Sequence, residues 1–133
     1  MHTEAVILNG PKDLSVDVLE ISPPAENDLV IQIDHSGIST GTEKLFWSGQ
    51  MPPFPGMGFP LVPGYKAAGE VVEAPAGSIY KTGDHVFVPG ANCYEGAFGL
   101  FGGAARTLVS QADRVTKIDK GFGPQGALLA LAA

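Results

Sequence analysis

The chain has 133 residues, enough for one domain with a hydrophobic core, and its 44% hydrophobic and 17% charged residues are typical of a globular protein. A formal net charge of −6 argues against nucleic-acid binding, and the longest apolar stretch, 126–133, is too short to span a membrane. The absence of a visible secretion signal and the single cysteine, Cys93, which excludes both an internal disulfide and a structural zinc site with several cysteines, predict a cytoplasmic protein.

Glycine and proline, 18 and 11 residues respectively, are spread along the chain and indicate many turns between short strands. Two short strands, 5–8 and 14–19, flank the turn 9–12 and predict a β-hairpin. The clearest strand pattern follows at 29–35, LVIQIDH. Its alternation predicts an inner face made of Leu29, Ile31, Ile33 and His35.

After this strand the pattern changes to a short helix and then to loops. Residues 42–48 predict two helical turns, with Thr40 or Thr42 as the N-cap. Residues 51–63 carry five prolines, which exclude regular structure. Further strands are predicted at 67–74, 85–88, 105–109 and 114–118, with a glycine-aromatic loop over 92–103.

Short strands between Gly and Pro turns predict a mostly β domain with short helices, built as a partly open β-barrel over residues 1–123. Residues 124–133 begin like a helix, with Pro124 at an early position and no polar face. We expect this helix to continue into a second domain. The alternative is a C-terminal helix packed on the barrel.

An ordered set of motifs covers nearly the whole chain. It consists of GIxxGTE from Gly37, PxVPGYKAAGEVVE from Pro60, GDHVFV from Gly83, GGAARTLV from Gly102 and RVTKI from Arg114. In this order the motifs resemble the N-terminal, GroES-like catalytic domain of medium-chain alcohol dehydrogenases. The resemblance implies a GroES-like barrel truncated before a Rossmann domain, which would hold most of the NAD and form the contact of a homodimer. Without that domain, this part of the enzyme would be inactive.

A narrower resemblance rests on the runs 36–65 and 99–105. They look like the family members that oxidise the hydroxyethyl group of a bacteriochlorin to acetyl, with NAD, in bacteriochlorophyll biosynthesis. The implied substrate is a chlorin or bacteriochlorin macrocycle that carries magnesium. Two other functions stay open: a quinone-reductase-like, zinc-free member of the same superfamily, and a non-enzymatic GroES-like binding or oligomerising module.

The residues that correspond to the family's zinc ligands have changed. The family's cysteine falls on Thr40, or on Ser39 if an insertion lies later, the histidine falls on Tyr65, and the glutamate falls on Lys66. Catalytic zinc needs thiolate, imidazole or carboxylate ligands, so a hydroxyl, a phenol and an ammonium do not hold it at neutral pH. We therefore expect no zinc and no other metal site.

A proton acceptor is still required for alcohol oxidation. The resemblance assigns the family's proton relay to Thr42 and its supporting acid to Glu43. We hypothesise that Tyr65 accepts the proton of the substrate hydroxyl, assisted by Lys66 and Thr42, much as a tyrosine with a nearby lysine acts in short-chain dehydrogenases. Because neighbours on a strand point to opposite faces, both side chains reach the site only if the chain bends at Gly64.

Each of these residues also has a structural alternative. Lys66 would then be a surface lysine paired with Glu43 or Glu70, and Tyr65 a half-buried strand aromatic. His35 is the second candidate for the proton acceptor, although a core histidine is the alternative.

The cofactor contacts expected in this half are Thr40, Gly41 and Thr42. Cys93 is expected to be inert.

The proline loop, residues 51–63, and the glycine-aromatic loop, residues 92–103, carry more large apolar side chains than loops usually do. An exposed surface of this kind typically binds a ligand. A flat macrocycle with a carboxylate fits such a surface. We expect Phe46 and Trp47 in the core and residues 54–59 at a cleft, with Arg106 either meeting the carboxylate or simply exposed. The predicted substrate-binding residues are Trp47, Phe54, Met57, Phe59, Tyr94, Phe98, Phe101 and Arg106.

Overall fold

The computed structural model describes residues 1–99 and 101–119. Its elements are β1 (His2–Gly10), β2 (Asp13–Glu20), β3 (Asp28–Ser36), α1 (Thr40–Ser48), β4 (Ala67–Glu73), β5 (His85–Val88), β6 (Thr107–Gln111), the 3-10 turn η1 (Ala112–Arg114) and β7 (Thr116–Lys117). The predicted mostly β class is confirmed. The helix predicted over 124–133 lies outside the described residues.

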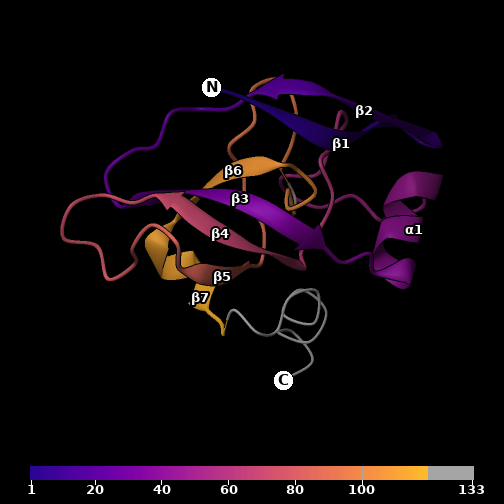
Figure 1. Cartoon of the computed structure of the whole chain (residues 1–133). Coiled ribbons are helices and arrows are strands. Elements are labelled where there is room, and N and C mark those ends of the chain that lie inside the picture. The colour runs from indigo at the N-terminus through magenta and orange to yellow at the C-terminus, as the bar shows by residue number, and fades with distance from the viewer. Residues whose placement is uncertain (100, 120–133) are drawn as a thin grey trace.

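All strand pairs are antiparallel. β1 and β2 form the predicted hairpin, and a five-stranded sheet has the order β6-β3-β4-β5-β7. The hairpin runs along one side of this sheet, and α1 stands beyond the end of β3 (Figure 1). Isolated bridges, Ala5 with Ala105 and Leu8 with Leu61, join β1 to the rest of the domain. The hairpin and the sheet thus form the GroES-like, partly open barrel.

The main core is made by side chains from β1, β3, β4, β5 and β6 and from the loops between them. Leu29, Val30 and Ile31 are all buried, so the strict alternation predicted for this strand is wrong. The register of β3 against β4 shifts between Val30 and Ile31 and again between Ile33 and His35. Each such bulge re-aims the side chains that follow it, and His35 is exposed rather than on the inner face.

Two later strands differ from the predicted boundaries. Residues 104 and 105 contact β1 through the bridge of Ala105 and a 2.9 Å bond from the Val6 N–H to the Ala104 carbonyl, so β6 begins only at Thr107. Of the predicted strand 114–118 only the short β7 is present, and Arg114 belongs to η1 instead. The first residue of the predicted strand 105–109 thus pairs with β1 instead of belonging to β6.

Helix α1 begins two residues earlier than predicted, and its N-cap position is Ser39, not Thr40 or Thr42. Its C-cap is Gly49, whose φ of 76° turns the chain so that the following Gln50 N–H reaches the Leu45 carbonyl at 3.0 Å. Nowhere in residues 1–99 and 101–119 is a helix both long and apolar enough to cross a membrane.

Candidate active site

The bend expected at Gly64 is present. This residue has a φ of 103°, and a Cβ built on it would lie 3.0 Å from the Ala104 amide nitrogen, so glycine suits both the conformation and the space. On the other side of the bend, the Gly37 N–H donates to the Lys66 carbonyl at 2.6 Å. The segment that carries Tyr65 is therefore held against the loop that leads into α1.

This arrangement brings three hydroxyl groups together. Tyr65 Oη and Thr42 Oγ1 lie 3.5 Å apart, at the outer limit of a hydrogen bond, and the Ser39 side chain also bonds to the phenol. These bonds, the one with Ser39 first, lower the pKa of Tyr65 below its ordinary value, although burial and the charge of Glu43 act in the opposite direction. A lowered phenol pKa favours the phenolate, which is the form that accepts a proton.

Lys66 lies beside Tyr65 and contacts the face of its ring. Its Nζ is 5.8 Å from the centroid of the Tyr65 ring and stands over the ring. The lysine charge is the smallest of the causes that shift the pKa of Tyr65. Within the described part of the chain, Lys66 makes no ion pair with Glu43 or Glu70.

Glu43 lies in the first turn of α1, where its carboxylate is partly buried. Burial raises the pKa of this carboxyl above its ordinary value, more than backbone hydrogen bonds and the Lys66 charge lower it. Its Oε2 is buried and has no hydrogen-bond partner among the described residues. The side chain lines an apolar cavity of about 240 Å³ together with Leu14, Ile38 and Trp47.

The other polar residues predicted for the site differ in how much of their surface is exposed. Thr40 and Gly41 are exposed at the start of α1, Thr42 is partly buried, and His35 is exposed on β3. Cys93 is buried, which raises the pKa of its thiol and agrees with an inert role.

A path of aromatic rings leads from the proline loop to Tyr65. The ring of Phe46 lies 6.3 Å from that of Phe54 and 6.4 Å from that of Phe101, and the rings of Phe101 and Tyr65 are 5.1 Å apart. Such distances are typical of packed aromatic pairs. Around this path is a second apolar cluster, in which Leu8 and Leu61 are buried. The partly buried members of the cluster are Met51, Met57, Phe59 and Phe101.

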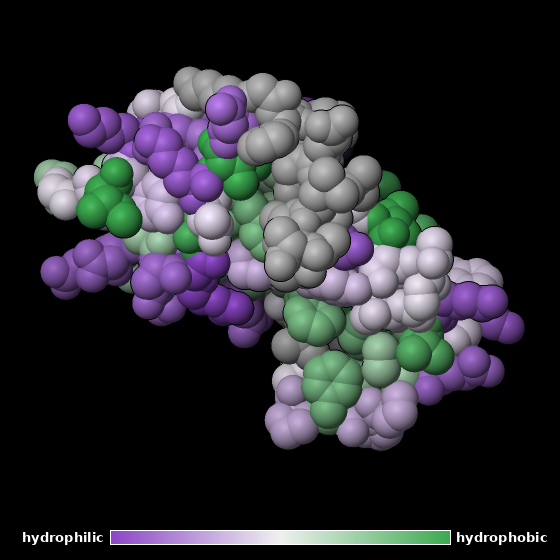
Figure 2. Space-filling model, turned by 90° about the horizontal axis from the view of Figure 1, so that it is seen from below, coloured by the Kyte–Doolittle hydropathy of each residue, from purple (hydrophilic) through white to green (hydrophobic). Residues whose placement is uncertain are grey.

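The two loops predicted to bind substrate lie side by side. The Phe98 N–H donates to the Pro60 carbonyl at 2.8 Å, and the Val62 N–H donates to the Phe98 carbonyl at 2.9 Å. Phe54 and Phe98 are 37% and 44% exposed. Apolar side chains of this kind reach the surface in separate groups between hydrophilic ones (Figure 2).

Two predicted residues, Trp47 and Tyr94, occupy other places than expected, whereas Arg106 is exposed, which is one of its two expected places. Trp47 is 42% exposed, whereas its neighbour Phe46 is 1% exposed and lies in the core as predicted. Tyr94 is buried, and its hydroxyl donates to the Gly102 carbonyl, so it is a core residue and not part of a substrate surface. The Arg106 Nε pairs with Glu4 Oε1 at 3.1 Å.

The side chains around Tyr65 do not fit a catalytic zinc ion. Zinc in enzymes is held by thiolates, imidazoles or carboxylates, and of the groups at this site only Glu43 belongs to these kinds. The described residues contain no group of three His, Cys, Asp or Glu side chains placed to hold a metal ion.

The partly open barrel, with a polar site at the start of α1, identifies the chain as a GroES-like domain. The sequence pattern of the alcohol dehydrogenase GroES-like domain matches residues 25–120, and the chain belongs to this family. The 2-desacetyl-2-hydroxyethyl bacteriochlorophyllide A dehydrogenase of Rhodobacter capsulatus is 58% identical over 134 residues, which cover 100% of this chain and 43% of that protein. The chain thus spans less than half the length of this relative.

Solved structures agree with the fold. The chain matches 2R,3R-butanediol dehydrogenase from Bacillus subtilis with a TM-score of 0.77 and 22% identity, over 96% of this chain and 44% of the other. It matches a short chain alcohol dehydrogenase from Escherichia coli, solved with NADH, with a TM-score of 0.74 and 20% identity, over 96% and 42%. At these identities the likeness shows the fold alone.

Proposed function

We propose that this chain is the catalytic domain of a zinc-independent, NAD-dependent dehydrogenase that oxidises the hydroxyethyl group of a bacteriochlorophyllide to acetyl in bacteriochlorophyll biosynthesis. The identity of 58% with a bacteriochlorophyllide dehydrogenase supports the substrate class. The mechanism rests on one observation: the Tyr65 phenol bonds to Ser39 and Thr42, and these bonds lower its pKa. The family resemblance aligns Tyr65 with a zinc ligand.

The reaction removes a hydride from the carbinol carbon and a proton from its hydroxyl, so that a C=O double bond forms. The Tyr65 phenolate accepts the proton, and Thr42 passes it on toward solvent. NAD⁺, when bound, supplies the hydride acceptor. In this chain Thr40, Gly41 and Thr42 would contact it, because they lie at the partly open start of α1. A Rossmann domain elsewhere in the protein would hold most of the cofactor.

Charge develops on the substrate oxygen as its proton leaves. The Lys66 ammonium, over the ring of Tyr65, supplies a positive charge beside the phenol. A fixed charge of this kind stabilises a developing alkoxide without the reorganisation that water would need. Lys66 thus takes over part of the electrostatic role that zinc has in other family members.

The pigment would lie on the aromatic side of Tyr65. Phe54 and Phe98 are half exposed, and Phe101 contacts the Tyr65 ring. A flat macrocycle buries much apolar surface by stacking on such rings, which holds its hydroxyethyl group near the phenol.

The whole protein, incubated with NAD⁺ and the hydroxyethyl pigment, should form the acetyl pigment and NADH in equal amounts. Tyr65→Phe should lower kcat by about 10²–10⁴-fold with little change in KM, because the phenol transfers a proton and contributes little to binding. Tyr80→Phe is the matched control, since the Tyr80 hydroxyl donates to the Val115 carbonyl at 3.0 Å in the core. If wild type yields no acetyl pigment, the proposed function is wrong; if Tyr65→Phe turns over like wild type, the mechanism is wrong.

Metal analysis tests zinc independence separately. Purified active protein should contain far less than one zinc per chain, and prolonged treatment with a chelator should leave kcat unchanged. Zinc bound in equal amount to the protein, with activity lost on its removal and restored on its return, would contradict the proposal.

A further inference from the structure

A cavity of about 380 Å³ lies next to the aromatic path. Three segments that are far apart in the chain line it: Gly56 from the proline loop, Phe98 and Phe101 from the glycine-aromatic loop, and Arg114 from the end of η1. The volume is within the range of small-molecule sites, and the lining combines apolar rings with one cation.

Phe101 connects this cavity to the candidate active site. Phe101 lines the cavity, and its ring contacts the Tyr65 ring edge-on at a centroid distance of 5.1 Å. Phe98 is held in place by its backbone bonds to Pro60 and Val62, while the residue stays 44% exposed. A flat ligand over Phe98 and Phe101 would therefore extend from Tyr65 toward Arg114.

The two arginines of the chain differ in their partners. Arg106 is engaged by Glu4 at 3.1 Å, whereas Arg114 has no carboxylate within ion-pair distance in the described part of the chain. A guanidinium presents several N–H donors in a plane and binds a carboxylate through two of them. Arg114 is thus the arginine that is available to an anionic ligand.

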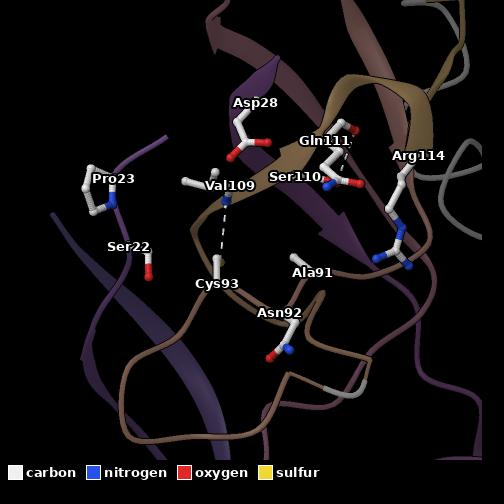
Figure 3. Close-up of a pocket in the computed structure, with 10 residues that line it drawn as sticks. All are labelled: Ser22, Pro23, Asp28, Ala91, Asn92, Cys93, Val109, Ser110, Gln111 and Arg114. Carbon is white, nitrogen blue, oxygen red and sulfur yellow. Dashed lines mark hydrogen bonds between the residues drawn. The ribbon is translucent and has the colours of Figure 1, made fainter. Parts of the chain in front are cut away.

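Arg114 also borders a neighbouring cavity of about 290 Å³, drawn in Figure 3. Asp28 lines that second cavity, and its negative charge would repel a carboxylate. Figure 3 shows the Arg114 guanidinium directed toward the Ala91 segment, which both cavities share, and not toward Asp28. The cavity with the aromatic rings is therefore the one that suits an apolar anion.

We propose that Arg114 binds the free carboxylate of the pigment while its macrocycle lies over Phe98 and Phe101. This inference rests on the proposed function, since it assigns a second anchoring point to the same substrate. The reacting hydroxyethyl group and the carboxylate are then held at two ends of one surface, which sets the orientation of the ring at Tyr65. Arg114 is a binding residue that selects the acid over its esters.

The test compares the hydroxyethyl pigment as the free acid and as its methyl ester, in the whole protein with NAD⁺. Wild type should show a kcat/KM about tenfold higher for the acid, mostly through KM, because the ester lacks the charge-assisted bonds. Arg114→Gln should lose this preference by lowering kcat/KM for the acid alone. Arg106→Gln is the matched control, with the same change of charge at the other arginine, and should keep the preference.

The outcomes separate the two proposals. If wild type oxidises both pigments equally, or if Arg114→Gln still prefers the acid, the carboxylate site is wrong while the proposed function stands. If wild type forms acetyl product from neither pigment, the proposed function fails and this inference fails with it. Arg114→Lys keeps the charge without the paired donors and should recover only part of the preference, which distinguishes binding geometry from net charge.

Discussion

The hydroxyl oxygens of Thr42 and Tyr65 lie 3.5 Å apart, although the two residues are 23 positions apart in the chain. Two local features produce this contact. Helix α1 begins at Thr40, which places Thr42 in its first turn, and the positive φ of Gly64 turns the chain so that Tyr65 faces the helix. The contact thus joins Thr42, which the family resemblance makes a proton relay, to Tyr65, which it aligns with a zinc ligand.

Ser39→Ala should move the pH dependence of kcat/KM to higher pH. The Ser39 bond is the largest cause of the lowered Tyr65 pKa, and its loss raises the pH at which the active phenolate forms. Ser39 makes no side-chain capping bond within the described residues, so α1 should be retained. Ser48→Ala, which removes a hydroxyl at the other end of α1, is the control. An unmoved profile, or one moved to lower pH, would show that Ser39 does not set this pKa.

Gly64→Ala should reduce both stability and turnover. The added Cβ meets a φ of 103° and the Ala104 nitrogen at 3.0 Å, and a rearranged bend would displace Tyr65. Gly96→Ala is the matched control, because Gly96 has a φ of 81° and open space around its Cβ. Urea unfolding should show a loss of about 1–2 kcal/mol for Gly96→Ala and a larger loss for Gly64→Ala. Equal losses would mean that the contact with Ala104 imposes no constraint.

Phe46→Ala should cost about 3–5 kcal/mol of unfolding free energy, because Phe46 fills the centre of the second apolar cluster. Trp47→Ala should cost about 1 kcal/mol, since this side chain is half exposed and its main partner is the Lys12 ammonium, 6.0 Å from the ring centroid. Denaturant unfolding measures both, with Phe46→Leu as the variant to use if Phe46→Ala does not fold. A larger loss for Trp47→Ala would contradict this core.

Glu43→Gln should change how stability depends on pH. Because the folded pKa of Glu43 is raised, its contribution to stability is full below the ordinary value of 4.5 and is lost as pH rises through the folded pKa. The unfolding free energy of Glu43→Gln relative to wild type should therefore increase with pH above 4.5 and then level off. Glu73→Gln, at an exposed carboxylate, should show a smaller change. A relative stability that falls with pH would contradict the burial of Glu43.

Local sequence patterns predicted much of the fold. The hairpin, β4 and β5 appear at or within a few residues of their predicted positions, since alternation and turn residues act over a few neighbours. A bend at Gly64 was the condition for Tyr65 and Lys66 to share one site, and the φ of 103° at Gly64 meets it. The bulges of β3 were not, and they explain why His35 is exposed.

Packing between distant segments decided the rest. Phe46 and Trp47 are neighbours of similar hydrophobicity, and only the position of α1 against Leu8 and Leu61 determines which of them is buried. Arg114 carries no sequence signal for binding, because it is twelve or more residues away from the aromatic rings that share its cavity.

The sequence by itself determined the mostly β class of the domain and the order of most of its strands along the chain. These properties depend on residue type and on spacing along the chain. Only the tertiary structure decided that Ser39 and Thr42 bond to Tyr65, that Tyr94 belongs to the core, and that Arg106 is engaged while Arg114 is available. Such contacts join residues that the chain keeps apart, so they exist only once the barrel has closed around its core.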